Sequence, residues 1–287
     1  MMKPECRATV AGSICALILF LASLHPGAAI ANSSTNLANL CRVEKDPDPV
    51  HDIEAAERQC DALIRKRGLD DQTLVRAYNN RCWMRIRRGA ADEALRDCAL
   101  AISLQPDFVP AYVNRGRTWL MLGKDAEARN DFEAAIRIDP DNAAAWNNRG
   151  LIYLKAGEFQ TAMDDFDKAI ALDSSMPGPY NNRGLVYDAV GAFDNAVEEF
   201  DKALKADPRF ADAAYNRGLI AFKRGRHDAA IKDFNLSVKF RKNFGRALLM
   251  RGAAFEIKGR LKNAHRDYLL ARSAGLSSQW LRRKLTR

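Results

Sequence analysis

Small and apolar residues return along most of the chain at a fixed interval of 34 residues, without an insertion or a deletion. Two series of glycines and one series of alanines keep this interval: Gly116, Gly150, Gly184, Gly218 and Gly252; Gly89, Gly123, Gly157, Gly191, Gly225 and Gly259; and Ala94, Ala128, Ala162, Ala196, Ala230 and Ala264. A strict period of this length predicts stacked helix-turn-helix repeats, each of which buries its apolar face against the next. The predicted fold is therefore all-α, with six repeats at 75–108, 109–142, 143–176, 177–210, 211–244 and 245–278.

The residue types within each repeat resemble the tetratricopeptide repeat (TPR) family. Counted from the first residue of a repeat, the family has aromatics at positions 4, 11 and 24, glycine at 8, alanine at 20 and 27, and proline at 32. The second repeat supplies Tyr112, Gly116, Trp119, Ala128, Phe132, Ala135 and Pro140, and the third lacks only the proline, where Ser174 stands. The resemblance implies a right-handed solenoid, with an N-terminal helical cap in residues 32–74 and a basic C-terminal capping segment at 279–287.

The first 31 residues have the pattern of a secretory signal peptide. Lys3 and Arg7 precede an apolar run from Ala8 to Leu24, and Ala29 and Ala31 are small residues at the places that a signal peptidase reads. The alternative is a segment retained as a membrane anchor, for which the run is marginally short. The sequence therefore predicts a periplasmic or secreted protein, and the resemblance extends to exported bacterial members of the family.

Cleavage after Ala31 leaves four cysteines, an even number in a compartment where disulfides persist. In the first repeat, Cys82 and Cys98 replace the glycine at position 8 and the aromatic at position 24, which the family brings face to face. We expect a disulfide between them, and a second one between Cys41 and Cys60 across the N-terminal cap. The alternative is a set of buried free thiols.

Charged residues of both signs recur in step. Position 7 is arginine and position 23 is acidic in every repeat, and the helical hairpin brings these two positions side by side. The predicted structural ion pairs are Arg81–Asp97, Arg115–Asp131, Arg149–Asp165, Arg183–Glu199, Arg217–Asp233 and Arg251–Asp267. The alternative is a row of arginines that binds an anionic ligand.

A row of asparagines is the best functional clue. Position 6, which faces the concave groove in TPR superhelices, is Asn80, Asn114, Asn148, Asn182 and Asn216, before Met250 ends the series. This row resembles the asparagine ladder in the TPR superhelix of O-linked N-acetylglucosamine transferase. An asparagine side chain both donates and accepts, so it can grip the backbone of an extended peptide. The predicted peptide-binding groove adds Asn79, Asn147, Asn181, Arg117 and Lys155. The alternative is that these asparagines bond neighbouring helices.

One familiar ligand site of the family is absent from every repeat. Some TPR domains grip C-terminal carboxylates with lysine at position 5 and asparagine at position 9, and no repeat has this pair. Position 9 is instead Trp83, Arg117, Leu151, Leu185 and Leu219 in the first five repeats, an apolar strip beside the asparagines.

The formal charge of +9 is unevenly distributed. From Tyr215 to Arg287 the chain has 19 lysines and arginines and four acidic residues, so its basic end could meet an anionic membrane surface or an acidic partner. The alternative is a solvated basic cap. Nucleic acid is not expected, because no readout motif accompanies the charge.

No catalytic, metal-binding or cofactor motif is present, so we expect no enzyme and no cofactor. The predicted function is a non-catalytic, exported scaffold that grips an extended segment of a partner protein. The alternative is a membrane-proximal assembly or adaptor factor that docks through the basic end.

Overall fold

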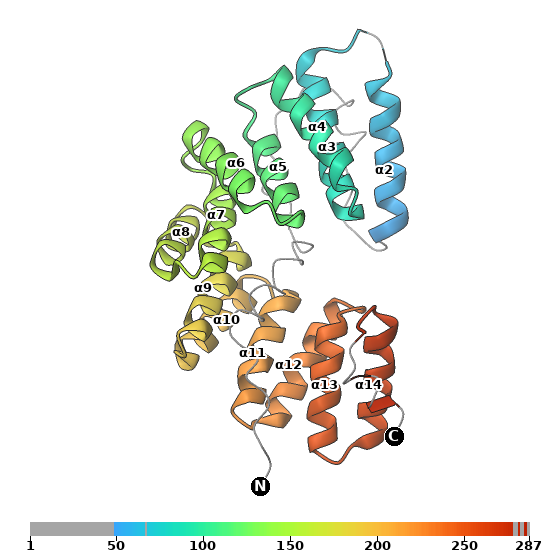
Figure 1. Cartoon of the computed structure of the whole chain (residues 1–287), viewed down its shortest axis with the longest axis vertical. Helices are drawn as coiled ribbons and strands as arrows, with labels where there is room; N and C mark the ends of the chain where they lie inside the picture. The colour runs from blue at the N-terminus through green and yellow to red at the C-terminus, as the bar shows by residue number, and fades with distance from the viewer. Residues whose placement is uncertain (1–48, 67, 278–280, 282–283, 286–287) are drawn as a thin grey trace. The chain divides into compact units, whose positions relative to one another are not determined.

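The computed structural model describes residues 49–66, 68–277, 281 and 284–285, and the predicted signal peptide lies outside them. The described part is all-α and contains thirteen helices and no strand (Figure 1). The chain divides into two compact units, Met1–Thr161 and Ala162–Arg287, and the boundary falls within helix α8 (Phe159–Leu172). Each unit is described by itself.

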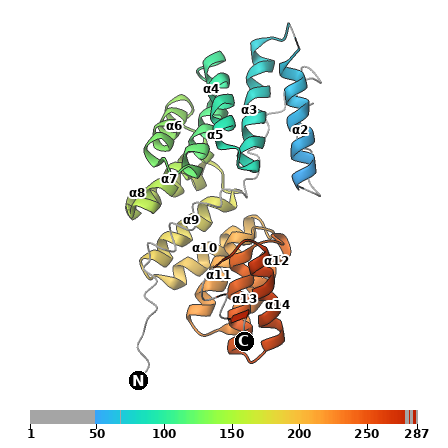
Figure 2. The same ribbon diagram turned by 45° about the vertical axis from the view of Figure 1, so that its right-hand side comes forward.

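Unit 1 contains one single helix, two complete helical hairpins and the first helix of a third hairpin. The helices are α2 (Pro49–Ile64), α3 (Asp71–Arg88), α4 (Ala91–Leu104), α5 (Val109–Met121), α6 (Asp125–Ile138) and α7 (Ala143–Ala156). The two helices of a hairpin, α3 with α4 and α5 with α6, lie side by side (Figure 2). We call the first helix of a repeat helix A and the second helix B.

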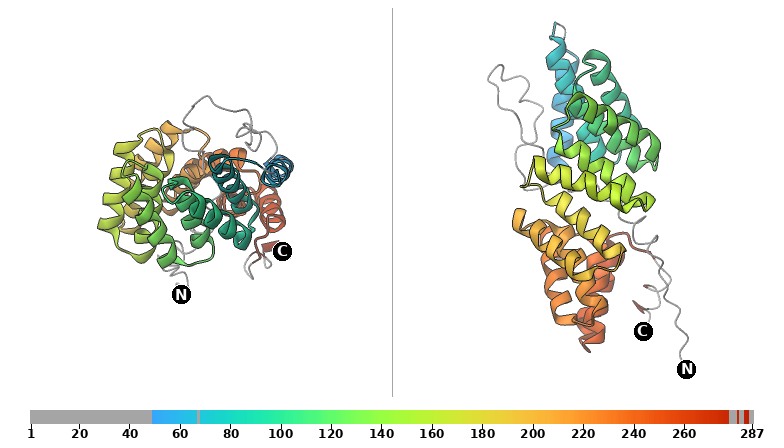
Figure 3. Two further views of the ribbon diagram at one scale, coloured as in Figure 1. Left: turned by 90° about the horizontal axis from the view of Figure 1, so that it is seen from above. Right: turned by 90° about the vertical axis from the view of Figure 1, so that its left-hand side faces the viewer.

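Unit 2 contains three complete hairpins built in the same way. Its helices are α9 (Pro177–Ala189), α10 (Phe193–Ala206), α11 (Ala211–Lys223), α12 (His227–Phe240), α13 (Gly245–Ile257) and α14 (Leu261–Ser273). Each of these three hairpins packs its A helix on its own B helix, and the B helices of the first two also contact the A helix that follows (Figure 3). The expectation of an all-α fold built from helical repeats is thus confirmed.

The A helices form a layer of their own within each unit. Helix α5 contacts both α3 and α7 in unit 1, and α11 contacts both α9 and α13 in unit 2. We name the side chains at positions 5, 6, 9 and 13 of these helices the A-helix face, because the predicted groove residues all belong to it.

The first repeat starts earlier than its period predicts. Helix α3 begins at Asp71, four residues before the expected start of the repeat at Val75. The cause is an N-cap: the Asp70 side chain accepts hydrogen bonds from the backbone N–H and the hydroxyl of Thr73, both 2.8 Å long. The described helix of the predicted N-terminal cap is α2, and the earlier part of the cap lies outside the described residues.

The last repeat is covered by part of the predicted C-terminal capping segment. Leu281 is 1% exposed and packs into a cluster with Leu248 of α13 and Tyr268 of α14. Lys284 binds the carboxylate of Glu256, which also accepts a 2.6 Å hydrogen bond from the Tyr268 hydroxyl. These contacts close the apolar end of the array.

Glycine and aromatic residues set the distance between the helices of a hairpin. The aromatic at position 24 is fully buried as Phe132, Phe166, Phe200 and Phe234. A Cβ atom on Gly184 would lie 2.6 Å from Cε1 of Phe200, closer than any real contact. Gly157 has a different task, because its φ of 80° gives α7 a left-handed end that other residues rarely adopt. The period of glycines therefore reflects close approach at position 8 and helix ends at position 15.

Within the described residues, no helix combines the length and the apolar composition needed to cross a membrane.

We expect Gly184→Ala to destabilise the protein by up to about 2 kcal/mol. The change gains about 1 kcal/mol of helix propensity, but overpacking against a buried ring costs about 1–3 kcal/mol. Thermal unfolding followed by circular dichroism measures the difference. Phe200→Leu provides space for the added methyl group, so the double variant should lose less stability than the two single changes together. A higher melting temperature for Gly184→Ala would contradict this account of the glycine period.

Candidate functional site

The recurring arginines of position 7 bind the acidic residues of position 23 on their own B helix. The Nε atoms donate to these carboxylates over 2.6 to 3.0 Å. The acidic partners are among the most buried polar side chains of the described residues, from 0% exposed at Asp267 to 6% at Asp233. The pairs seen within the units are Arg81–Asp97, Arg115–Asp131, Arg183–Glu199, Arg217–Asp233 and Arg251–Asp267. Arg149 belongs to unit 1 and Asp165 to unit 2, so this predicted pair falls across the boundary.

Most of these arginines also bind the preceding hairpin, a contact that the sequence did not predict. The guanidinium of Arg217 binds Asp233 and, over 2.6 Å, Asp201 at position 25 of the repeat before. The same second partner is Asp167 for Arg183 and Asn235 for Arg251, and Arg81 uses Asp61 of α2. Hydrogen bonds to Asp233 and Asp201 raise the pKa of Arg217. One guanidinium therefore joins three helices.

Aromatic side chains at position 4 hold the same arginines from another side. The guanidinium carbon lies 4.7 to 5.8 Å from the ring centre in four repeats, a cation–π distance. The pairs are Arg81 on Tyr78, Arg115 on Tyr112, Arg149 on Trp146 and Arg183 on Tyr180. With acids and rings already in contact, the row of arginines favours the structural interpretation over an anion-binding ladder.

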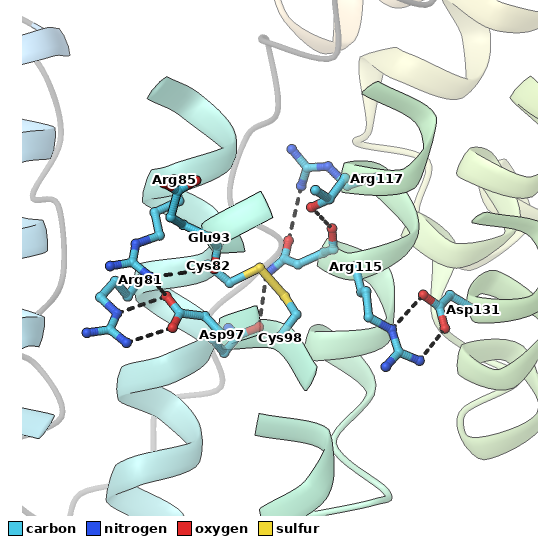
Figure 4. Close-up of a disulfide and its surroundings, with 12 residues drawn as sticks. Arg81, Cys82, Arg85, Glu93, Asp97, Cys98, Arg115, Arg117 and Asp131 are labelled. Carbon is cyan, nitrogen blue, oxygen red and sulfur yellow. Dashed lines mark hydrogen bonds and ion pairs between the residues drawn. A yellow bond between two sulfur atoms is a disulfide. The ribbon is translucent and has the colours of Figure 1, made fainter. Parts of the chain in front are cut away.

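A disulfide joins Cys82 and Cys98 in the first hairpin, with Cα atoms 5.6 Å apart (Figure 4). It occupies the place that the glycine–aromatic contact has in the other hairpins, and the ion pair of Arg81 with Asp97 lies beside it. Cys60 is fully buried, but Cys41, its expected partner, lies outside the described residues. The second bridge therefore stays a prediction.

Most of the predicted asparagine ladder is buried, and part of it is hydrogen-bonded between neighbouring A helices. Asn114 Nδ2 donates to Asn79 Oδ1 over 2.9 Å, and Asn216 Nδ2 donates to Asn181 Oδ1 over 2.8 Å. Position 6 of one repeat thus binds position 5 of the repeat before. The same residue types recur at Asn147 and Asn182, and Asn80 is half-buried. These contacts match the structural alternative, in which asparagines bond neighbouring helices.

Asn148 departs from this pairing. Position 5 of the repeat before it is Val113, which has no side-chain acceptor or donor. Asn148 is 1% exposed, and its Oδ1 has no hydrogen-bond partner. A buried amide oxygen without a partner is uncommon and costs free energy, which marks this side chain as a place where a ligand could contribute a donor.

The two basic residues predicted for the groove differ in their surroundings. Lys155 binds Asp125 of the preceding hairpin over 2.6 Å, so its charge is already neutralised. Arg117 is 5% exposed and contacts Asn114 Oδ1 at 3.5 Å, while its Nε and Nη2 have no partner. Burial, together with the nearby charge of Arg87, lowers the pKa of Arg117 to about 9.

The part of the chain that the structure describes holds no group of three or more histidine, cysteine, aspartate or glutamate side chains that could bind a metal ion.

Known proteins share the repeat sequence and the fold of this chain. The tetratricopeptide repeat family model matches residues 113–177 and 181–244. A comparison with curated protein sequences finds no significant match. Among solved structures, the chain is similar to a tetratricopeptide repeat protein from Parabacteroides merdae, with 21% identity, a TM-score of 0.62 and coverage of 82% of this chain and 92% of that one.

Two further structures share the fold. For pilF of Pseudomonas aeruginosa the identity is 18% and the TM-score 0.60, over 76% of this chain and 99% of that one. For the Cut9–Hcn1 hetero-tetramer of APC/C the values are 17% and 0.69, over 83% of this chain and 48% of that one. The fold is that of an all-helical repeat superhelix. The chain thus carries tetratricopeptide repeats over residues 113–177 and 181–244, and its fold is that of solved tetratricopeptide repeat proteins.

We expect Arg217→Ala to destabilise the protein by about 2–4 kcal/mol, because it leaves the buried carboxylate of Asp233 without its cation. Asp201→Asn is the matched control on the other side of the same guanidinium. Its side chain is 55% exposed, so the loss should stay below about 1 kcal/mol. Chemical denaturation of both variants measures the two losses. Equal losses of unfolding free energy in the two variants would mean that the buried contact with Asp233 contributes no more to stability than the exposed contact with Asp201.

Proposed function

We propose that this chain is a non-catalytic, exported scaffold that binds an extended segment of a partner protein along the A-helix face of unit 1. The observation that carries the proposal is the Oδ1 atom of Asn148, a buried acceptor without a partner in a row whose neighbours form amide–amide bonds. A backbone N–H of an extended peptide would satisfy it, and recognition through the peptide backbone is independent of side-chain sequence.

Apolar side chains beside the asparagines support the same proposal. Leu151 stands at position 9 of the same helix and is half-buried, so part of its surface is open to solvent. Trp83 of α3 is also half-buried at this position. An apolar strip next to an unused acceptor is the combination with which proteins hold an extended chain, since the strip contributes affinity and the acceptor fixes register.

The presence of tetratricopeptide repeats supports binding to a partner protein. Tetratricopeptide repeats generally mediate protein–protein interactions, and the related Cut9 structure is that of a complex with Hcn1. The repeats thus support binding to a protein, and the part of the surface that this chain uses for it is our proposal.

Export is part of the proposal and rests on two observations. The first 31 residues have the signal-peptide pattern, and the disulfide between Cys82 and Cys98 is of a kind that persists in oxidising compartments. We therefore propose a periplasmic or secreted location.

We expect Asn148→Ala to weaken partner binding at least tenfold, with a small effect on folding because the lost oxygen has no partner to strand. Pull-down from a periplasmic extract, followed by titration of the captured protein, measures the affinity. Asn130→Ala is the matched control, since Asn130 is an exposed asparagine on α6. Unchanged binding by Asn148→Ala, or substrate turnover by the purified protein alone, would contradict the proposal.

A second function, docking on an anionic membrane surface through the C-terminal end, is favoured by the exposed side of α14. Leu269 is 38% exposed and Leu270 44% exposed, and the exposed Lys262 and Arg266 precede them on the same side of the helix. Leucine and basic side chains mixed on one helical face suit the boundary of an anionic bilayer.

The charge reversal Lys262→Glu with Arg266→Glu should weaken binding to phosphatidylglycerol vesicles at least tenfold, since each basic residue near the surface contributes about 1 kcal/mol. Vesicle sedimentation at low and high salt measures the binding, which should also fall as salt screens the attraction. Arg137→Glu with Lys168→Glu changes the net charge equally and is the control. Equal loss in both variants would show that net charge alone is responsible.

A further inference from the structure

Arg117 is an exception at its position in the repeat. Position 9 is occupied by apolar side chains in the other five repeats, namely Trp83, Leu151, Leu185, Leu219 and Ala253. Arg117 is nevertheless 5% exposed, which is as buried as the carboxylate of Asp131 in the same hairpin. A guanidinium in this place needs an explanation, because isolated buried charges are strongly unfavourable.

The hydrogen bonds of Arg117 leave one edge of its guanidinium unused. Nη1 has a long contact of 3.5 Å with Asn114 Oδ1, and Nε and Nη2 are buried without a partner (Figure 4). Arg115, two residues earlier on the same helix, uses this same edge on Asp131, with Nε at 2.9 Å and Nη2 at 2.7 Å from the two carboxylate oxygens. The unused edge of Arg117 is therefore the edge that binds a carboxylate elsewhere in the hairpin.

A second cation stands near Arg117 and adds to the unbalanced charge. Arg87 of α3 lies at position 13 of the A-helix face, with its guanidinium carbon 5.3 Å from the centre of the Trp83 ring. Its charge contributes to the lowered pKa of Arg117, which places the two groups within electrostatic reach of each other. Neither arginine forms an ion pair with a carboxylate among the residues described. A buried cation without an acid, with further positive charge in reach, favours a bound anion.

We propose that Arg117 binds a carboxylate of the partner segment on the A-helix face of unit 1. The site rests on the proposed function, because the carboxylate belongs to the segment held there. The planar edge formed by Nε and Nη2 can donate in parallel to the two oxygens of a carboxylate, as Arg115 does to Asp131. The acid is either an aspartate or glutamate side chain of the segment or its C-terminal carboxylate.

The arrangement differs from the carboxylate clamp that some TPR domains carry. That clamp needs lysine at position 5 and asparagine at position 9, whereas this site has Val113 at position 5 and the arginine itself at position 9 of its repeat. The second cation comes from position 13 of the preceding repeat.

Arg117→Leu tests the site through the direction in which the melting temperature changes, because an arginine with a purely structural role would give the opposite direction. Leucine is the residue of three other repeats, so removing an unpaired buried charge should raise the melting temperature by about 2–6 °C. Arg137→Leu removes the same charge from an exposed place on α6 and should leave the melting temperature within about 1 °C. A lower melting temperature for Arg117→Leu would overturn the proposal, since it would mean that the arginine stabilises the unliganded fold.

Small carboxylates probe the site without a partner protein. Sodium acetate, exchanged for sodium chloride at constant ionic strength, should raise the melting temperature of the wild-type chain and of Arg137→Leu by a few degrees, and that of Arg117→Leu by less. Arg117→Lys keeps the charge but loses the planar edge, so its response should also fall. An equal response in all four chains, or a response to phosphate but not to acetate, would overturn the carboxylate assignment.

Peptide binding distinguishes a side-chain carboxylate from a C-terminal carboxylate. It also tests the Arg117 site separately from the proposed function. Dodecapeptides selected on the wild-type chain are compared with versions in which the C terminus is amidated, and with versions in which aspartate and glutamate become asparagine and glutamine. Loss of binding on amidation assigns the C-terminal carboxylate, and loss on the second change assigns a side chain. In either case Arg117→Leu should bind at least tenfold more weakly. Peptides that bind wild type and Arg117→Leu equally would overturn the site alone, whereas failure of Asn148→Ala to affect binding would overturn the proposed function.

Discussion

The stacking of the hairpins depends on the arginine of position 7, whose guanidinium can bind its own hairpin and the preceding helix at the same time. The arginine of position 7 reaches the buried acid of its own B helix and, in most repeats, an oxygen of the hairpin before it. Because the guanidinium is rigid and planar, these bonds fix direction as well as distance. Apolar burial between hairpins is non-directional and would tolerate a range of rotations, so the arginines are well placed to select one of them. Each of these arginines therefore needs the acid of its own B helix in place, because a buried charge without its partner is strongly unfavourable.

The A-helix face follows from this arrangement. Once neighbouring hairpins have a fixed rotation, their A helices lie close enough for Asn114 to bind Asn79 and for Asn216 to bind Asn181. Asparagine therefore has a structural task wherever position 5 of the preceding repeat can accept. Asn148 and Arg117 are the exceptions. Asn148 follows a repeat with Val113 at position 5, and Arg117 stands at position 9, where the other repeats have apolar residues. Both therefore keep buried polar atoms without a hydrogen-bond partner.

The sequence is sufficient for the fold and for the pairing within hairpins. Glycine and alanine at a fixed period leave little choice of architecture, and the matched recurrence of arginine and acid identifies the partners. The contacts between hairpins are harder to predict from the sequence. Position 25, which supplies the second partner of the arginines, varies from Ala99 to Asp167 and Asn235 and shows no period. The burial of Arg117 was out of reach as well. The sequence places Arg117 in the predicted groove, but its burial depends on how close α3 and α5 approach, a distance that no single repeat encodes.

The disulfide of the first hairpin makes the two ends of the array unequal. In a linear array the terminal repeats have one neighbour fewer and open first, so cooperative loss of structure usually begins at an end. The bond between Cys82 and Cys98 ties the two helices of the N-terminal hairpin covalently, whereas the opposite end is closed by Leu281 and by the contacts of Glu256. Local opening should therefore be easier in the last hairpin than in the first, and a reducing environment would narrow that difference.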